Sequence, residues 1–239
     1  MKAWLKVCLF ALAAAFITGC NDDDDSSMTP TEAQLRVVHG SADAPAVDIL
    51  VNDAAAFTNK SFKDVTEYAM LPPATYNVKV VGTGTTTAVF EADIPVEANK
   101  KYSAIALDKF TGGTGPFTVI LLEDNVEVKD DMAQLRLIHG SAFANDASTA
   151  GVDIYVTAPQ ADITNLTPNV SALVFKKDTG YVALPAGQYE VSLTPTGTKT
   201  VVKMVTIDLE NGKVYNAIAS DTDANFAAVD LILLDAFVE

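Results

Sequence analysis

The segment Ala33-Gln-Leu-Arg-Val-Val-His-Gly-Ser-Ala42 returns later in the chain as Ala133-Gln-Leu-Arg-Leu-Ile-His-Gly-Ser-Ala142. Eight of the ten positions are identical, and the other two exchange one aliphatic residue for another. The match continues with Val47-Asp48-Ile49 and Val152-Asp153-Ile154, and with Tyr102-Ser-Ala-Ile105 and Tyr215-Asn-Ala-Ile218. A repeat of this length indicates a duplicated domain of about 100 residues and not a short solenoid unit.

Apolar and polar residues alternate within each copy, as they do in β-strands. In the first segment Leu35, Val37 and His39 share one side, and the residues between them share the other. Clusters of Gly, Pro, Asn and Asp separate such runs, and no stretch shows a helical stripe longer than two turns. The sequence therefore predicts an all-β fold of two tandem antiparallel β-sandwich domains, with about seven strands each.

The expected strands and domain limits follow from these runs. The first copy should have strands near 34–39, 46–51, 61–70, 75–82, 86–94, 101–108 and 117–122. The second should have them near 134–139, 151–157, 171–183, 188–194, 199–208, 214–219 and 228–234. We expect domains at 33–124 and 133–239, joined by an acidic linker at 125–132.

The first 19 residues have the form of a secretory signal. Lys2 and Lys6 precede an unbroken apolar run, Val7 to Ile17, which is too short to span a bilayer. The run ends in Ile17-Thr18-Gly19-Cys20, which resembles the bacterial lipobox. This resemblance implies that Cys20 carries acyl chains such as palmitate and becomes the mature N-terminus. Two or more such chains anchor a protein firmly to a membrane.

The segment that follows Cys20 predicts a solvated tether. Residues 20–32 include four consecutive aspartates, Asp22 to Asp25, and few apolar side chains. Asn21 directly follows the cysteine, so the best-known signal for inner-membrane retention, an aspartate, is absent. We therefore expect an exported protein anchored to the cell membrane, in the outer membrane if the host is Gram-negative.

Charge and cysteine content exclude several classes of function. The formal net charge is −15, and it becomes −17 once the signal and its two lysines are removed. So acidic a surface repels nucleic acid, so no DNA or RNA partner is expected. Cys8 leaves with the signal and Cys20 serves the anchor, so the domains have no disulfide, cysteine nucleophile or thiolate metal site.

The repeated motifs also resemble a known family. Arg-[Val/Leu]-[Val/Ile]-His-Gly-Ser-Ala, Val-Asp-Ile and Tyr-x-x-Leu-Pro-[Pro/Ala]-x-x-Tyr are similar to bacterial domain-of-unknown-function family 4397, twice over residues 33–235. The resemblance implies exported tandem domains of immunoglobulin or transthyretin type, with no activity to transfer. Ser41-Ala-Asp-Ala-Pro45 becomes Ser141-Ala-Phe-Ala-Asn145 plus an insertion in the second copy, which puts any function of that loop in doubt there.

His39 and Asp48, with their counterparts His139 and Asp153, are the repeated candidates for ligands or general bases. The alternative is structural: each histidine ends its strand facing the core, and each aspartate pairs with an arginine or accepts turn N–H groups. One histidine per copy makes a poor transition-metal site. Ser41 and Ser141 follow His-Gly but lack a nucleophile elbow, so a hydrolase is not favoured.

A calcium site is only weakly indicated. Asp221, Asp223 and Asn225 have the spacing that opens a calcium loop, but Phe226 and Ile232 stand where glycine and a bidentate glutamate belong. No cofactor is therefore expected, with calcium as the alternative.

The sequence thus favours a non-enzymatic binding, adhesion or structural module. Its partners would be the bilayer, through Cys20, and an envelope protein or surface ligand. The copies differ most at the insertions 143–151 and 157–170, which are the expected contact loops. The alternative is a calcium-dependent or hydrolytic protein that uses the repeated His and Asp positions.

Overall fold

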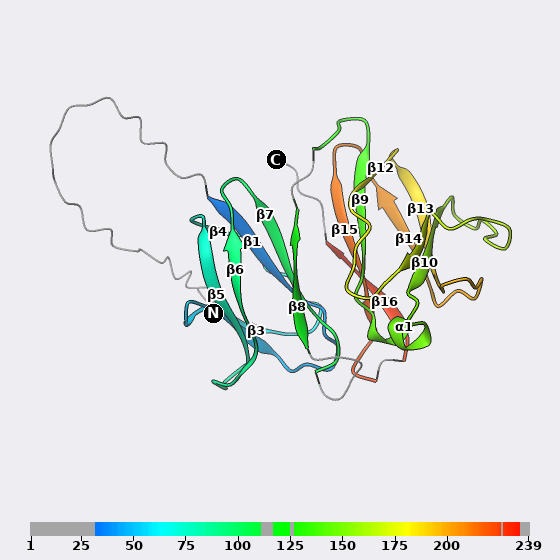
Figure 1. Ribbon diagram of the computed structural model, residues 1–239. Coiled ribbons are helices and arrows are strands. Elements are labelled where there is room, and N and C mark those ends of the chain that lie inside the picture. Colours follow the sequence, from blue (N-terminus) through cyan, green and yellow to red (C-terminus); the bar gives the residue numbers. More distant parts are fainter. Residues whose placement is uncertain (1–31, 111–116, 125–126, 226, 235–239) are drawn as a thin grey trace, which may run out of the picture.

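A computed structural model of the chain describes residues 32–110, 117–124, 127–225 and 227–234 (Figure 1). The expected signal, Cys20 and the acidic tether up to residue 31 lie outside the described residues. Among the described residues, no helix combines the length and the hydropathy needed to cross a membrane.

The described part of copy one contains eight strands in two sheets, which we call its inner and outer sheets. The inner sheet has the order β4-β1-β7-β8, with β1 at Ala33–His39, β4 at Ala69–Leu71, β7 at Lys101–Leu107 and β8 at Thr118–Glu123. The outer sheet has the order β3-β2-β5-β6, with β2 at Val47–Val51, β3 at Ala54–Lys60, β5 at Ala74–Gly82 and β6 at Ala88–Val96.

Copy two repeats this arrangement. Its inner sheet has the order β12-β9-β15-β16, with β9 at Ala133–His139, β12 at Val182–Leu184, β15 at Val214–Asp221 and β16 at Val229–Leu234. Its outer sheet has the order β11-β10-β13-β14, with β10 at Val152–Thr157, β11 at Val170–Leu173, β13 at Gly187–Pro195 and β14 at Lys203–Leu209. A short helix, α1 at Ala142–Ala147, follows β9.

The all-β tandem fold is confirmed, but each inner sheet contains one parallel pair. β1 pairs with β7, and β9 with β15, in the parallel sense, while the other pairings are antiparallel. Each parallel pair needs a crossover connection, because its two strands run in the same direction. The chain between them supplies it by building the outer sheet on the way.

The prediction of single long strands at 61–70 and 171–183 is wrong. Copy one instead has β3 and β4 around the first segment, and copy two has β11 and β12 around the second. The two strands of each pair belong to different sheets of the same copy. The turns between them place Lys63 and its counterpart Lys176 at φ +71° and +65°, a left-handed conformation that breaks a strand. Each segment therefore crosses from the outer to the inner sheet, where a continuous strand would have stayed in one.

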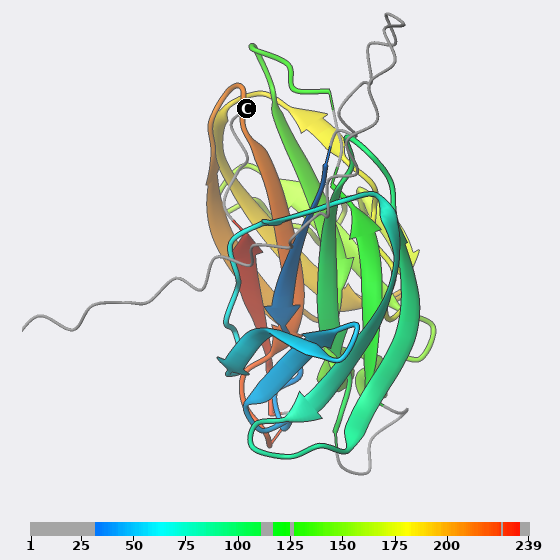
Figure 2. The ribbon, with the colours of Figure 1, turned by 90° about the vertical axis from the view of Figure 1, so that its left-hand side faces the viewer.

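Each copy has its own core between its inner and outer sheets. In copy one Leu35 and Val37 of β1 pack with Ile49, Val78 and Val80 of the outer sheet. The corresponding side chains of copy two form an equivalent cluster. The faces expected to be apolar are therefore buried within each sandwich. Figure 2 shows the strands of copy one in front of those of copy two.

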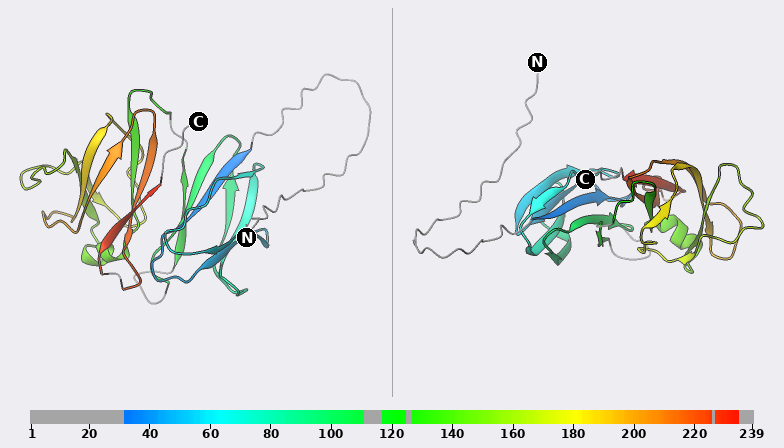
Figure 3. Two further views of the ribbon diagram at one scale, coloured as in Figure 1. Left: turned by 180° about the vertical axis from the view of Figure 1, so that it is seen from behind. Right: turned by 90° about the horizontal axis from the view of Figure 1, so that it is seen from above.

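A third apolar cluster lies between the copies. It is formed by Val38, Ile105 and Leu107 of copy one and Ile138, Ile218, Ile232 and Leu234 of copy two. These residues alternate with those of the sandwich cores, so they project from the other face of each inner sheet. The two inner sheets therefore pack against each other, and the molecule is a stack of four sheets with β16 at the junction (Figure 3).

One glycine allows this close packing. Gly140 follows β9 in the repeated His-Gly-Ser motif, and its match Gly40 follows β1, where the nearest neighbours of an added Cβ belong to copy one itself. A Cβ atom added at Gly140 would lie 2.7 Å from Cδ2 of Leu107, a fully buried side chain of the other copy. A side chain at Gly140 would therefore push the copies apart.

We expect Gly140→Ala to lower the free energy of unfolding by about 1–3 kcal/mol, because the added methyl overpacks the junction. Gly82→Ala is the control, since its Cβ would make an ordinary contact at 3.4 Å with Thr85 Oγ1; we expect it to change stability by about 0.5 kcal/mol or less. Urea denaturation measures both. Equal effects of the two substitutions would contradict the packing described here.

Candidate functional site

The histidines repeated in both copies lie inside the protein. His39 and His139 end β1 and β9, and each is 1% exposed. The His39 ring faces the core of copy one, with its Nε2 atom 3.2 Å from the carbonyl oxygen of Pro45. Burial lowers the pKa of His39, and the Pro45 carbonyl opposes that effect. A histidine in this setting is part of the core and is not open to solvent.

His139 is more isolated from polar groups than its counterpart. Its ring meets Phe175 edge-on at a centroid distance of 5.6 Å, and neither ring nitrogen has a hydrogen-bond partner in the described chain. Burial lowers the pKa of His139 to about 4, so the ring is neutral at pH 7. The helix-bearing insertion of copy two has replaced the loop that supplies Pro45 in copy one.

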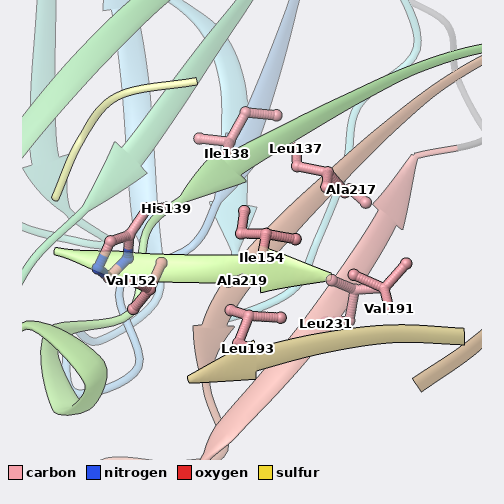
Figure 4. Close-up of a pocket in the computed structure, with 10 residues that line it drawn as sticks. All are labelled: Leu137, Ile138, His139, Val152, Ile154, Val191, Leu193, Ala217, Ala219 and Leu231. Atoms are coloured by element: carbon pink, nitrogen blue, oxygen red, sulfur yellow. The ribbon is translucent and has the colours of Figure 1, made fainter. Parts of the chain in front are cut away.

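Each histidine borders a small apolar cavity between the sheets. The cavity beside His139 has a volume of about 10 Å³, with Val152, Ile154 and Leu193 in its wall (Figure 4). The matching cavity beside His39 has a volume of about 20 Å³. Such spaces are near the lower limit for a single water molecule, and far below the several hundred cubic ångströms of a ligand pocket.

The repeated aspartates face away from the histidines. Val47 and Ile49 line the His39 cavity, so Asp48 between them projects from the opposite face of the outer sheet. The same alternation separates Asp153 from His139, because Val152 and Ile154 face the cavity. The structure therefore does not bring His and Asp together in either copy, and the two cannot act as a dyad.

Each aspartate instead fastens turns to its sheet. Asp48 Oδ1 accepts hydrogen bonds from the Asn59 backbone N–H at 2.7 Å and the Thr83 hydroxyl at 2.8 Å, which lower the pKa of Asp48. Asp153 accepts from the backbone N–H groups of Ala172 and Gly197, both at 2.9 Å. Each aspartate thus joins an irregular point of one neighbouring strand, Asn59 in β3 or Ala172 in β11, to a turn that follows the strand on its other side. This is close to the structural alternative in which the aspartates accept turn N–H groups.

The weak calcium candidates are also engaged within the chain. Asp221 accepts hydrogen bonds from the Ser141 hydroxyl at 2.6 Å and from the N–H groups of Ala142 and Phe143, so it holds the first turn of α1. Burial raises the pKa of Asp221. Asp223 accepts from the N–H of Asn225 at 2.8 Å. Within the described ranges, no group of three or more His, Cys, Asp or Glu side chains has a metal-binding arrangement.

The serines of the His-Gly-Ser motif are buried. Ser41 Oγ donates to the carbonyl oxygen of Asp108 at 2.6 Å. Ser141 Oγ caps α1 by accepting the Ala144 N–H at 3.1 Å, and it donates to Asp221. Both serines are at most 1% exposed. They therefore have a structural use in the turns where the inner sheets end.

The polar cluster that the sequence did not predict is centred on Asp124. This residue follows β8 and directly precedes the acidic linker expected at 125–132, yet its side chain is 0% exposed. Arg136 Nη1 lies 3.5 Å from Asp124 Oδ1, and Arg36 Nη2 lies 3.8 Å from Oδ2. One carboxylate thus contacts the matched arginines of both copies.

Hydroxyl groups complete the cluster on the copy one side. Arg36 Nε donates to Ser103 Oγ at 2.7 Å, and that hydroxyl donates to Asp124 Oδ2 at 2.5 Å. The Tyr68 hydroxyl donates to the same oxygen at 2.9 Å, and the Tyr68 ring lies under the Arg36 guanidinium at 4.9 Å. Burial and the negative charge of Asp124 raise the pKa of Tyr68.

Copy two supplies the equivalent groups. The Asn216 amide donates to Asp124 Oδ1 at 3.2 Å, and the Tyr181 hydroxyl lies 3.4 Å from it. The Arg136 guanidinium stacks 4.0 Å above the Tyr181 ring and donates to the Glu123 carbonyl oxygen. Burial and Asp124 raise the pKa of Tyr181 to about 12, so both phenols stay protonated as donors.

Fold and polar clusters together define a class: a tandem β-sandwich protein whose repeated polar motifs serve packing, turns and the contact between copies. A family model described as "Domain of unknown function (DUF4397)" matches residues 33–147 and again 142–236. The chain belongs to this family and contains two tandem copies of its domain. No curated protein matches the sequence.

Two solved structures align with most of the chain. One is titled "The Bacillus anthracis TIE protein", with 14% identity, a TM-score of 0.26, and coverage of 80% of this chain but only 34% of that chain. The other is titled "Alpha-glucan recognition by family 41 carbohydrate-binding modules from streptococcal virulence factors", with 8% identity, a TM-score of 0.26, and coverage of 80% and 95%. Scores this low carry no functional argument.

Replacing Asp124 by asparagine tests the buried cluster. We expect Asp124→Asn to lower the free energy of unfolding by about 3–5 kcal/mol, because it removes the carboxylate that two buried guanidinium groups share. Glu123→Gln is the control, since that neighbouring side chain is 43% exposed in its ion pair with Lys100 and should contribute about 1 kcal/mol or less. A similar small loss in both variants, measured by urea denaturation, would argue against the cluster.

His139 should make stability depend on pH. Its folded pKa of about 4 lies below the ordinary 6.5, so the unfolded chain binds more protons between these values. Stability is then complete above pH 6.5 and falls as the pH drops toward 4. We expect His139→Phe, which keeps a ring beside Phe175, to remove about 2 kcal/mol of the loss between pH 7.5 and pH 4.5.

The matched control is His39→Phe, measured by the same urea titrations at both pH values. It should remove less of the pH dependence, because the Pro45 carbonyl opposes the effect of burial on His39. An unchanged pH dependence in His139→Phe would mean that this ring is not held neutral by burial.

Proposed function

We propose that this chain is an exported lipoprotein, held at a membrane by acyl chains on Cys20, and that its fused pair of β-sandwiches is a non-enzymatic binding, adhesion or structural module. The observation that carries the second half is the separation of the repeated side chains: each His lies between the two sheets of its sandwich, and each Asp lies on the other face of the outer sheet. General acid–base chemistry needs such groups within hydrogen-bond reach of one substrate.

The N-terminal sequence supports the first half of the proposal. Lys2 and Lys6, the apolar run Val7 to Ile17 and the small residues before Cys20 occur in the order that a lipoprotein signal requires. The acidic stretch after Cys20 suits a tether between a bilayer and the first strand. The outer membrane of a Gram-negative cell is the destination we propose, because Asn21 and not aspartate follows the cysteine.

The two insertions of copy two have different roles in this proposal. The one at 143–151 contains α1 and turns toward copy one, where Lys109 Nζ lies 2.6 Å from Asp146 Oδ2. The one at 157–170 lies on the outer sheet of copy two, as the yellow-green loop at the right-hand edge of Figure 1. We propose the second as the contact surface.

The loop at 158–169 is held in place yet presents an apolar side chain. Ile163 is buried, Asn169 Oδ1 accepts the Val156 N–H at 2.8 Å, and Lys199 donates to the Leu166 carbonyl oxygen. The Leu166 side chain itself is 42% exposed. A fixed loop with an exposed leucine suits contact with a partner protein, since little ordering is needed on binding.

Substitution of the anchor residue tests the proposal. In cells that express the full chain, Cys20→Ser should move the protein from the membrane pellet to the soluble periplasmic fraction, because the sulfur that carries the acyl chains is gone. Cys8→Ser is the matched control and should remain in the membrane, since that cysteine lies in the cleaved signal. Immunoblotting of the fractions and the mass of the mature N-terminus give the result.

Two outcomes would refute the anchoring. A Cys20→Ser protein that still sediments with membranes would show that the chain is held in another way. An unmodified N-terminus in the purified native protein would show that Cys20 carries no lipid.

A further inference from the structure

The contact between the copies has the form of a two-fold symmetric interface. Leu107 of copy one approaches Gly140 of copy two, where an added Cβ would lie 2.7 Å from its Cδ2. The residue matching Leu107 in copy two is Ser220, and its hydroxyl donates to the carbonyl oxygen of Gly40, the match of Gly140, at 3.3 Å. A contact that recurs with the two sides exchanged defines an isologous interface, as in a homodimer.

The same exchange relates the groups around Asp124. Tyr68 and Tyr181, Ser103 and Asn216, and Arg36 and Arg136 are matched pairs, and every member contacts the one carboxylate. Asp124 therefore lies close to the axis that relates the copies. A residue in that position is a neighbour of both halves even though it belongs to one.

Apolar and charged pairs extend the symmetry across the face. Val38 and Ile138, and Ile105 and Ile218, are matched residues that meet in the cluster between the inner sheets. Lys63 and its match Lys176 each reach across the junction to an aspartate, Asp230 and Asp108, at 2.7 Å in both cases. The two lysines are matched, whereas their acceptors are not, because Asp108 corresponds to Asp221 and Asp230 to Thr118. The apolar and basic residues of the face thus follow the two-fold exchange, and the acidic partners of the lysines do not.

We propose that this inner-sheet face is a self-recognition surface, whose partner is the equivalent face of another copy in the same chain or in a second chain. Two chains then pair reciprocally, with copy one of each chain on copy two of the other. The proposal rests on the junction alone and is independent of the membrane anchor and of any ligand.

The choice between the two forms depends on concentration. Both forms make the same contacts, so the choice between them depends on the effective concentration at which the covalent connection holds the two copies of one chain, on the order of millimolar for a short connection. A copy that is separated from its partner would expose to solvent the isoleucines and the arginine that the junction normally buries. This cost favours pairing with the matching face of another copy. Chains that refold together at high concentration should therefore exchange.

Cross-linking of mixed chains tests the proposal. The chain from Asn21 onward contains no cysteine. One form of it would carry Lys63→Cys, and a second form with a larger tag would carry Asp230→Cys. After joint unfolding and refolding, a bismaleimide long enough to span one Lys–Asp ion pair links the thiols only if copy one of one chain sits on copy two of the other. We expect a heterodimer, at roughly a tenth of the chains at 0.1 mM and less on dilution.

Two controls make the result decisive. A single chain with both Lys63→Cys and Asp230→Cys should cross-link internally at high yield. Lys79→Cys in place of Lys63→Cys should give only background, because Lys79 pairs with Asp53 on the outer sheet. The proposal is overturned if mixed chains stay at the Lys79→Cys background at all concentrations, or if the doubly substituted chain fails to cross-link internally.

Discussion

One carboxylate shared by two arginines sets the conditions for the rest of this molecule. Asp124 is sealed between the inner sheets, and the guanidinium groups of Arg36 and Arg136 lie buried on either side of it. Buried charges persist only when paired and hydrogen-bonded, so the tyrosines, Ser103 and Asn216 around Asp124 are part of the same requirement. The copies must approach closely enough to enclose this group, and Gly140, after β9, permits the close approach of Leu107 from copy one.

Much of the fold could be predicted from the repeat and its alternation. The duplicated segment at 33–42 and 133–142 and the period-two pattern gave two all-β sandwiches with the right core faces. The strand at 61–70 failed because Val65, Thr66 and Tyr68 favour β structure, while the left-handed residue that breaks it, Lys63, has no sequence signature. Tertiary crossing between sheets overrode local propensity there.

The junction was hidden for a related reason. Alternation ordinarily indicates one buried and one solvent-exposed face of a strand. The second face of β1 instead holds Val38 beside Arg36, and both are buried by the other copy. The isoleucines at 105, 138 and 218 were a usable signal, since apolar residues on the supposedly polar side of a strand need a cover. Asp124 gave none, because an aspartate in an acidic run is ordinarily solvated. Likewise, histidine and aspartate are residue types that often act as ligands or general bases, which made His39 and Asp48 candidates. Only the arrangement of the two sheets shows that their side chains point apart.

The four-layer stack also fixes a distance. Packed sheets lie about 10 Å apart, so the first and fourth layers are separated by about 30 Å of close-packed protein. The loop at 158–169 lies on the outer surface of the fourth layer, whereas the chain enters through copy one (Figure 1). Because the junction packs the layers into one body, this loop lies at a fixed distance from β1, where the chain enters copy one, and the two sandwiches form a rigid spacer between these points.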